Sequence, residues 1–301
     1  MQNTKPYNRE QGELCTAVKR VTLGGLVINL ILSMFKLASG VFGNSQAMIA
    51  DAVHSLSDSV TDVAILFGVR FWSAPPDERH PYGHWRIETL ITTAIGLVLI
   101  AVAIGISMNS IQTIKDGHVN PPSWMAFYAA VASIITKELL YHWTARTGRR
   151  LNSSSVVANA WHHRSDAMSS IPAAIAILTA RLKPEWGFVD HIGAIMVSGF
   201  VLYAAWGIIR SATGDLTDEA APEALLAEIR AICQHLAGVS SVHAVRTRKV
   251  GPGYHLDLHV LVNPVFSVRQ GHDIATQVKH RLIGQLPQVR DVIVHIEPDD
   301  E

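Results

Sequence analysis

The chain has 301 residues, of which 49% are hydrophobic and only 17% are charged, and its mean hydropathy is +0.22. This composition is too apolar for an ordinary soluble protein of this length, so it favours a membrane protein. The 25 basic and 25 acidic residues balance. No basic surplus therefore indicates a nucleic-acid partner, and no acidic surplus indicates a disordered tail.

Six stretches are long and apolar enough, at about 20 residues each, to be predicted as membrane-spanning helices. They cover residues 18–41, 47–72, 90–111, 124–143, 156–182 and 188–209. The fifth begins with polar groups and has weak hydropathy for a span. The first is too long for a signal-peptide core and lacks a convincing cleavage site, so we expect it to be retained.

Basic residues gather on one side of the six predicted spans. They precede the first span and fill the second-to-third and fourth-to-fifth loops: Lys5, Arg9, Lys19, Arg20, Arg70, Arg79, Arg86, Arg146, Arg149 and Arg150. By the positive-inside rule this side is cytoplasmic, which places both termini in the cytoplasm. The predicted fold class is a membrane α-helical protein with six transmembrane helices.

The sequence after Arg210 predicts a small soluble domain. An amphipathic stretch over 221–236 is followed by alternating segments at 242–246 and 255–260, which flank the turn Gly251-Pro252-Gly253. A helix over 268–286 and a strand over 292–296 complete an α-β-β-α-β, ferredoxin-like order. We expect a cytoplasmic segment over 1–17, a transmembrane domain over 18–210 and a cytoplasmic regulatory domain over 211–301.

His and Asp stand four residues apart in two of the predicted spans, as His54 with Asp58 and His162 with Asp166. Residues at this spacing lie on one face of a helix. Two facing pairs would offer two imidazole nitrogens and two carboxylate oxygens in the tetrahedral arrangement that zinc prefers. Each charge at the bilayer centre costs about 2.5 to 3.5 kcal/mol, and two carboxylates neutralise a divalent ion. The chain is also rich in His, with 15 residues.

Helix packing is the alternative explanation for either pair alone, because His and Asp form hydrogen bonds between spans. Two pairs in separate spans favour a metal site. Asp51 and Asp62 lie near the same stripe of the second span. We leave both outside the ligand set, with helix packing, a hydrogen bond to a neighbouring span or a charge on the ion's path as open roles. Imidazole must lose its proton to bind metal, which provides a basis for exchange against protons.

Two further regions hold potential metal ligands. The loop between the second and third spans contains Asp77, His80 and His84, which would bind a second ion or belong to a solvated loop. The soluble domain holds seven His residues. Strand alternation places His255, Asp257 and His259 on one side, and His243 can approach His259 across the hairpin. Cys15 and Cys233 lack CxxC spacing, so neither a disulfide framework nor a thiolate site is predicted.

These motifs resemble the cation diffusion facilitator family, and the resemblance covers nearly the whole chain. The segments that carry it are Ala50-Asp51-Ala52 with His54-Ser55-Leu56-Ser57-Asp58, Pro76-Asp77 with His80-Pro81-Tyr82-Gly83-His84, and His162 with Arg164-Ser165-Asp166. The resemblance implies a homodimer that exports zinc or a related divalent ion by proton antiport. His54, Asp58, His162 and Asp166 match the family's transport site.

The resemblance also implies the ion and the secondary sites. His at both 54 and 162 is similar to the zinc-preferring pattern, with Fe²⁺, Co²⁺, Cd²⁺ and Ni²⁺ as other possible ions. Asp77, His80 and His84 match a peripheral site, and Arg86 with Asp218 resembles a charge interlock. The family's ligand positions for cytoplasmic ions, regulatory zinc among them, match His243, His259, His272, His295 and Glu297. The compact fourth-to-fifth loop is similar to that of bacterial members, which implies a multi-pass protein of the inner membrane.

Two other functions remain as alternatives at this point. A membrane-anchored metal sensor would bind metal through the soluble domain and use the spans only as an anchor, which leaves the two intramembrane pairs unexplained. An intramembrane metalloenzyme would need an open coordination position, but the four predicted ligands form a closed shell and no HExxH motif is present. We therefore expect a transporter and not an enzyme.

Overall fold

A computed structural model describes residues 5–117, 120–150 and 153–299, without the side chains of 5–19, 61–62, 65–67 and 155. The chain forms two compact units. One runs up to Leu66 and takes in Ile95–Gly207, and the other combines Phe67–Ala94 with the chain from Ile208 onward. Each predicted span lies within helices, although the fifth is divided between two of them.

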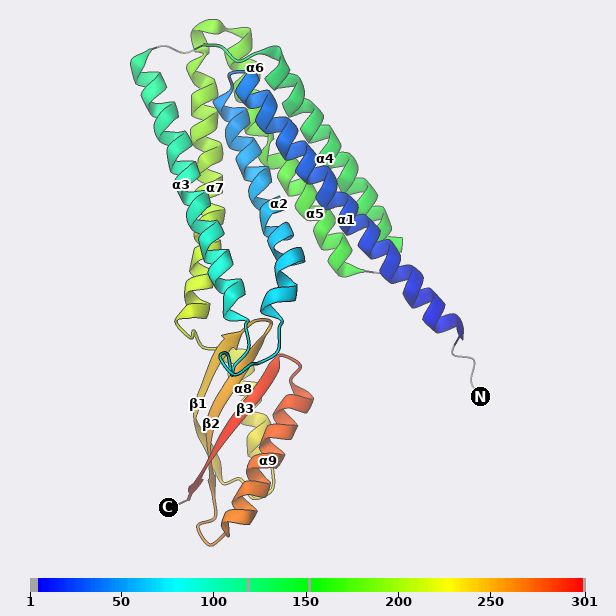
Figure 1. Ribbon diagram of the computed structural model, residues 1–301, viewed down its shortest axis with the longest axis vertical. Coiled ribbons are helices and arrows are strands. Elements are labelled where there is room, and N and C mark those ends of the chain that lie inside the picture. The colour runs from blue at the N-terminus through cyan, green and yellow to red at the C-terminus, as the bar shows by residue number, and fades with distance from the viewer. Residues whose placement is uncertain (1–4, 118–119, 151–152, 300–301) are drawn as a thin grey trace. The chain divides into compact units, whose positions relative to one another are not determined.

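The membrane region consists mainly of long helices (Figure 1). They are α1 Lys5–Phe42, α2 Gln46–Trp72, α3 Arg86–Asp116, α4 Trp124–Arg150, α5 Ser154–Ser169, α6 Ile171–Leu182 and α7 Phe188–Leu216, with a 3-10 turn at Pro184–Trp186. Helix α4 contacts α1, α5 and α6. This packing brings side chains from four helices together inside the first unit.

The fifth predicted span is two helices rather than one. Helix α5 ends at Ser169 and α6 begins at Ile171, with Ser170 between them. Pro172 lacks the N–H that would continue the hydrogen-bond ladder, and its ring crowds the carbonyl of Met168 one turn earlier. The expectation of a continuous helix over 156–182 was therefore wrong in this respect. The break lies one turn beyond Asp166.

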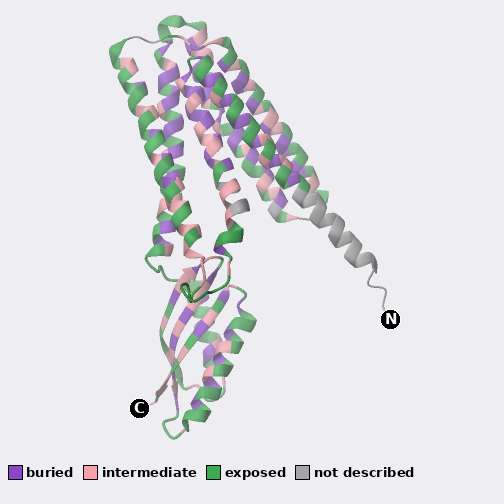
Figure 2. Cartoon of the chain, viewed as in Figure 1, coloured by how far each residue is buried: buried purple, intermediate pink, exposed green. Residues whose placement is uncertain are grey.

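Small residues form the core of the helical unit. Its buried cluster consists mainly of alanine, contributed by α2, α4, α6 and α7. At Gly193 of α7 a Cβ would stand 2.5 Å from the Cβ of Ala176 on α6, so only glycine permits this approach. Large apolar side chains such as Ile31, Leu97 and Trp206 are instead exposed, and Figure 2 shows exposed residues along the helices. Such an outward apolar surface fits a lipid environment.

Three helical segments in the described part of the chain are long and apolar enough to cross a membrane. They are Arg20–Phe42, Arg86–Asp116 and Pro184–Leu216. Helices α2 and α4 carry ionisable residues within their length, which lowers their hydropathy, and α5 and α6 have only 16 and 12 residues. A membrane domain is thus supported, and the count of six spans stays a prediction.

The C-terminal elements have the predicted α-β-β-α-β order. They are α8 Glu223–Gln234, β1 Ser241–Val250, β2 Gly253–Val262, α9 Val268–Gln285 and β3 Val289–Pro298. The sheet has the order β1-β2-β3, with β2 antiparallel to β1 and parallel to β3. Helix α8 contacts β1 and α9 contacts β3.

One face of this sheet forms the domain core, and the other carries histidines. Leu256, Leu258 and Val260 of β2 are buried against the two helices together with Ile229 and Val278. The residues between them on β2 point to the opposite face, because successive side chains of a strand alternate. This alternation exposes His259 and its neighbours on the side away from α8 and α9.

Candidate metal centres

The two predicted intramembrane pairs contribute three side chains to one cluster. Asp58 of α2 and both His162 and Asp166 of α5 each offer a ligand atom, and these atoms lie within 4.8 Å of one another. His162 Nδ1 is 3.7 Å from Asp166 Oδ1. Two carboxylates and one imidazole are ligands that suit zinc and neighbouring transition metals. The structure therefore joins α2 and α5 in a candidate metal centre.

His54 lies one turn before Asp58 on α2 and is outside this group of three. Its Nδ1 atom is buried, as is Asp58 Oδ2, and neither has a hydrogen-bond partner within the described part of the chain. Buried polar atoms without partners are costly, and a bound cation would satisfy both. His54 thus lies outside the cluster but has an unused donor atom one turn from Asp58.

Asp51 forms an ion pair with Lys36 and does not belong to the three-residue cluster. Its Oδ2 atom is 2.8 Å from Lys36 Nζ of α1, and its Oδ1 accepts a hydrogen bond of 2.8 Å from Ser170 Oγ. Both charged side chains are fully buried. Of the roles left open for Asp51, these contacts favour bonding to a neighbouring span. The side chain of Asp62 lies outside the described residues.

Two ionisable residues near the cluster received no role from the sequence. Lys137 of α4 is buried and its Nζ is 2.9 Å from Asp166 Oδ2. His163 is also buried, and at Gly25 of α1 a Cβ would stand 3.2 Å from its Nε2. The signal for Lys137 was a lysine inside an apolar stretch. Its partner could not be identified without knowing how α4 and α5 pack.

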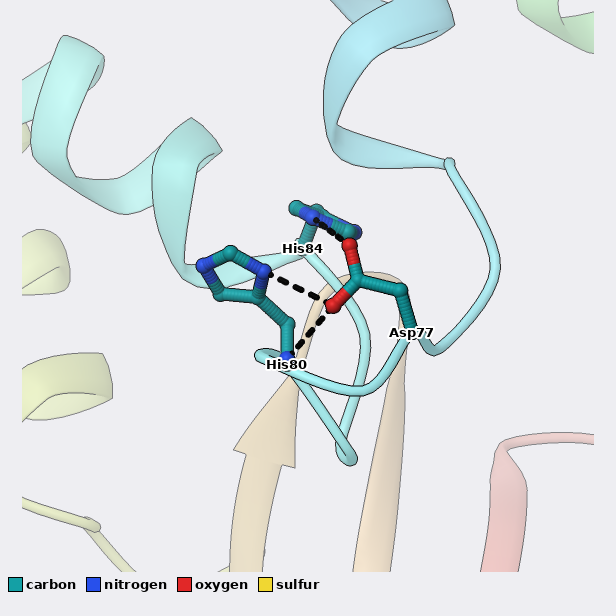
Figure 3. Close-up of side chains that lie close together, drawn as sticks. All are labelled: Asp77, His80 and His84. Carbon is teal, nitrogen blue, oxygen red and sulfur yellow. Dashed lines mark hydrogen bonds and ion pairs between the residues drawn. The ribbon is translucent and has the colours of Figure 1, made fainter.

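The loop before α3 gathers the three residues predicted there (Figure 3). Asp77 Oδ1 is 3.0 Å from His80 Nδ1, and Asp77 Oδ2 is 3.4 Å from His84 Nε2. Hydrogen bonds to Asp77 from the backbone N–H groups of His80 and Arg79 lower the pKa of this carboxyl, with the His80 N–H as the main cause. The carboxylate is thus favoured in its charged form, and half of its surface is exposed.

The strand register aligns three histidines across the open face of the sheet. His243 is paired with His259, and His259 with His295. Their rings stand 5.2 and 4.8 Å apart, centroid to centroid, along the row. The proximity of His243 to His259, predicted from the hairpin, is confirmed.

Glu297 follows His295 on β3 and contacts all three rings. Its oxygens lie 3.1 Å from His243 Nε2, 2.8 Å from His259 Nδ1 and 3.5 Å from His295 Nε2. His272 lies elsewhere, on α9, where it lines a cavity of about 440 Å³ together with Phe266 and Ile296. Four of the five predicted cytoplasmic ligands are therefore together in one chain, and His272 is separate.

The alternates His255 and Asp257 do not join this group. Burial lowers the pKa of His255, whose ring is 6.5 Å from that of Tyr82. Asp257 is paired in register with Arg246. Both residues share a face with His259 but lie nearer the opposite end of the strand. The histidine row is thus confined to the end of the sheet that carries Glu297.

Arg86 and Asp218, which resemble a charge interlock, form an ion pair of 2.5 Å. Arg86 also donates a hydrogen bond to the carbonyl oxygen of Asp215. Asp218 has a φ of 55°, in the left-handed region that turn residues adopt. The pair links the start of α3 to the segment that follows α7.

Both parts of the chain match known families. The cation efflux transmembrane domain matches residues 23–217, and the cation efflux protein cytoplasmic domain matches residues 221–299. An uncharacterized transporter of Methanocaldococcus jannaschii is 34% identical over 280 residues, which cover 93% of this chain and 98% of that protein. Manganese efflux system protein MneP of Bacillus subtilis is 29% identical over 285 residues, which cover 93% and 96%.

A solved structure of a MamM CTD is similar to the C-terminal part. It is 27% identical, covers 26% of this chain and 96% of that chain, and has a TM-score of 0.25. The family matches extend over both parts of the chain and include the residues that form the intramembrane cluster. The chain therefore belongs to the cation diffusion facilitator family, as a multi-pass membrane protein of divalent metal efflux and not an enzyme.

Proposed function

We propose that the protein carries zinc out of the cytoplasm in exchange for protons, with the ion bound between α2 and α5. The observation that carries this proposal is the cluster of Asp58, His162 and Asp166. His54, with its buried and unbonded Nδ1, supplies the fourth ligand once an ion draws the side chains together. Two carboxylates then balance the charge of the ion inside the membrane.

The preference for zinc rests on imidazole chemistry. Family membership alone does not set the ion, because one relative is named a manganese efflux protein. Imidazole nitrogen suits zinc, and also Fe²⁺, Co²⁺, Ni²⁺ and Cd²⁺, better than it suits manganese, which prefers oxygen ligands. With His54 and His162 both in the shell, zinc should compete effectively against manganese.

Exchange for protons follows from the same ligands. Imidazole must be neutral to bind metal, so His54 and His162 lose any proton as the ion enters. When the site opens to the other side of the membrane, protonation of the same groups favours release of the ion. Six spans, both termini in the cytoplasm and a location in the inner membrane complete the proposed arrangement, with alternating access to the cluster.

The cytoplasmic histidine row is the proposed regulatory site. His243, His259, His295 and Glu297 offer three imidazoles and a carboxylate on an open face. Zinc bound there would tighten a homodimer, with His272 as a further ligand. The loop residues Asp77, His80 and His84 would hold a separate, peripheral ion. Such binding changes transport only if the loaded and empty domains favour different states of the dimer.

The test is zinc flux into proteoliposomes under an imposed pH gradient, with wild type compared with Asp58→Ala and His162→Ala at equal incorporation. We expect flux to require the gradient and to vanish in both variants. His142→Ala is the matched control, because this exposed histidine of α4 pairs with Glu138 away from the cluster. Wild-type flux in Asp58→Ala would contradict the proposed site, whereas an absence of flux in wild type would favour a metal sensor that binds through the soluble domain. Zinc flux unaffected by excess manganese would support the ion preference.

A further inference from the structure

Two lysines are buried inside the helical unit, and each is bonded to an aspartate of another helix. Lys36 of α1 is 0% exposed and Lys137 of α4 is 1% exposed. Lys36 Nζ lies 2.8 Å from Asp51 Oδ2, and Lys137 Nζ lies 2.9 Å from Asp166 Oδ2. An ammonium group in such a place is tolerated only with a partner. Both ion pairs are therefore built parts of the bundle.

Serine hydroxyls connect the two ion pairs into one network. Lys36 Nζ donates to Ser55 Oγ and to Ser170 Oγ, each at 3.0 Å. Lys137 Nζ donates to Ser55 Oγ at 3.4 Å. Ser170 stands at the junction of α5 and α6, so the network joins α1, α2 and α4 to the point where the fifth predicted span breaks.

The two aspartates of the network differ in one respect. Asp51 bonds to Lys36 and Ser170, whereas Asp166 is bonded to Lys137 through one oxygen and is also a member of the metal cluster. Its other oxygen, Oδ1, is the one that faces His162. An ion bound in the cluster and the ammonium of Lys137 would therefore both bind the carboxylate of Asp166.

The charges of the site show what this sharing does. Asp58 and Asp166 together carry two negative charges, which would balance a divalent ion completely. The ammonium of Lys137 adds one positive charge in direct contact with Asp166. A loaded site then has one positive charge in excess, and like charges at this range inside a membrane repel strongly. The Lys36 and Asp51 pair adds no net charge.

We propose that Lys137 is a tethered counter-ion that competes with the transported metal for Asp166. In the empty site its ammonium neutralises this carboxylate, and an arriving ion displaces it. The return of the ammonium to Asp166 then helps to expel the ion, so Lys137 lowers affinity and raises the rate of release. This inference rests on the proposed function, because it takes the cluster to be the transport site.

The test removes the positive charge of Lys137 and leaves the metal ligands in place. Lys137→Met keeps an unbranched side chain without the ammonium, and Lys137→Gln keeps an N–H donor for Asp166 without the charge. Zinc binding is measured by calorimetry on the full chain in detergent, and the part of the isotherm lost in Asp58→Ala identifies the site. We expect zinc to bind about tenfold more tightly, or better, in Lys137→Met.

Flux in proteoliposomes provides a second readout. Tighter binding and slower release should lower both the half-saturating zinc concentration and the maximum rate in Lys137→Met. A lysine that served only to hold helices together would give the opposite change in affinity, because its loss would loosen the ligands. The direction of the change in half-saturation therefore separates competition for Asp166 from a packing role.

The matched control removes the other ion pair. The double variant Lys36→Met with Asp51→Leu deletes a buried lysine of the same network but leaves the net charge of the site unchanged. We expect its zinc affinity to equal that of wild type. Tightening in this control to the extent seen in Lys137→Met would overturn the inference, since loss of the network and not loss of charge would then be the cause.

The outcomes separate this inference from the proposed function. If Asp58→Ala removes zinc binding but Lys137→Met binds zinc no more tightly than wild type, the competition is refuted and the transport site stands. If Asp58→Ala removes no binding, the proposed site fails and the inference with it. Should Lys137→Met fail to fold, Lys137→Gln is judged by the same criterion, and an unchanged or weaker affinity in it refutes the competition.

Discussion

The buried pair of Lys36 and Asp51 offers a direct measure of what holds the helical unit together. Replacing Asp51 by Leu leaves an ammonium group inside the bundle without its carboxylate. Removing one partner of a buried ion pair costs roughly 3 to 5 kcal/mol in the free energy of unfolding. For a unit of this size each kcal/mol shifts the unfolding temperature by about 2 to 4 °C, so Asp51→Leu should melt about 10 °C below wild type.

The double variant Lys36→Met with Asp51→Leu should recover most of this loss. Replacing both charges by apolar groups of similar volume is often neutral or stabilising, because neither group then has to be desolvated. The assay is thermal unfolding in detergent, followed by size-exclusion chromatography at one heating rate, since membrane proteins often unfold irreversibly. A single variant as stable as wild type, or a double variant no more stable than the single one, would show that an unpaired Lys36 does not destabilise the bundle.

Three further predictions concern the remainder of the chain. Burial raises the pKa of the Cys233 thiol to about 11. In a Cys15→Ser background, Cys233 should therefore resist alkylation at pH 8 until the domain is unfolded, and rapid labelling of the folded protein would contradict this. Burial lowers the pKa of His255, so the stability contributed by its neutral ring is complete above the unfolded-state pKa of about 6.5 and is lost as the pH falls through the lower folded-state pKa. NMR titration should give a pKa below 6.5, and a higher one would count against the prediction. Arg86 and Asp218 are 38% and 52% exposed, so a double-mutant cycle should give a coupling of about 0 to 1 kcal/mol, and a coupling of several kcal/mol would be inconsistent with a solvated pair.

The soluble domain could be predicted from its sequence almost element by element. Alternation around the turn at Gly251 and Gly253 fixed the hairpin, and the spacing of 268–286 indicated α9, which the structure ends at Gln285. The approach of His243 to His259 followed from the same hairpin, because opposite residues of paired strands are neighbours. Local patterns sufficed here, since short connections leave few alternative pairings.

The intramembrane cluster was predicted less completely, because it depends on contacts between distant helices. Spacing placed His162 and Asp166 on one face of a helix, but the pairing of Asp166 with Lys137 requires the packing of α4 against α5. Nor could spacing show that His54 lies outside the group formed by Asp58 with α5. Helical periodicity gives the face on which a residue lies and not the distance to the facing helix.

Averaging hydropathy over a window explains why the division of the fifth span was not predicted and why several helices have a weak membrane signal. Hydropathy averages over a window, so one proline at 172 in an apolar stretch escapes notice. The same averaging counts Asp51 and Lys137 against a membrane helix, although each is paired inside the bundle. The residues of the site and its network thus weaken the signal by which their helices are recognised.

The most direct test of the transport site is the position of zinc in the full-length protein. We would collect anomalous diffraction at the zinc edge from zinc-loaded crystals of wild type and of Asp58→Ala. We expect an ion between α2 and α5 within about 2.0 to 2.2 Å of ligand atoms from Asp58, His162 and Asp166, and we expect no ion there in the variant. Zinc found at the loop and on the histidine row, with none between α2 and α5 in wild type, would show that the transport site is not formed by these residues.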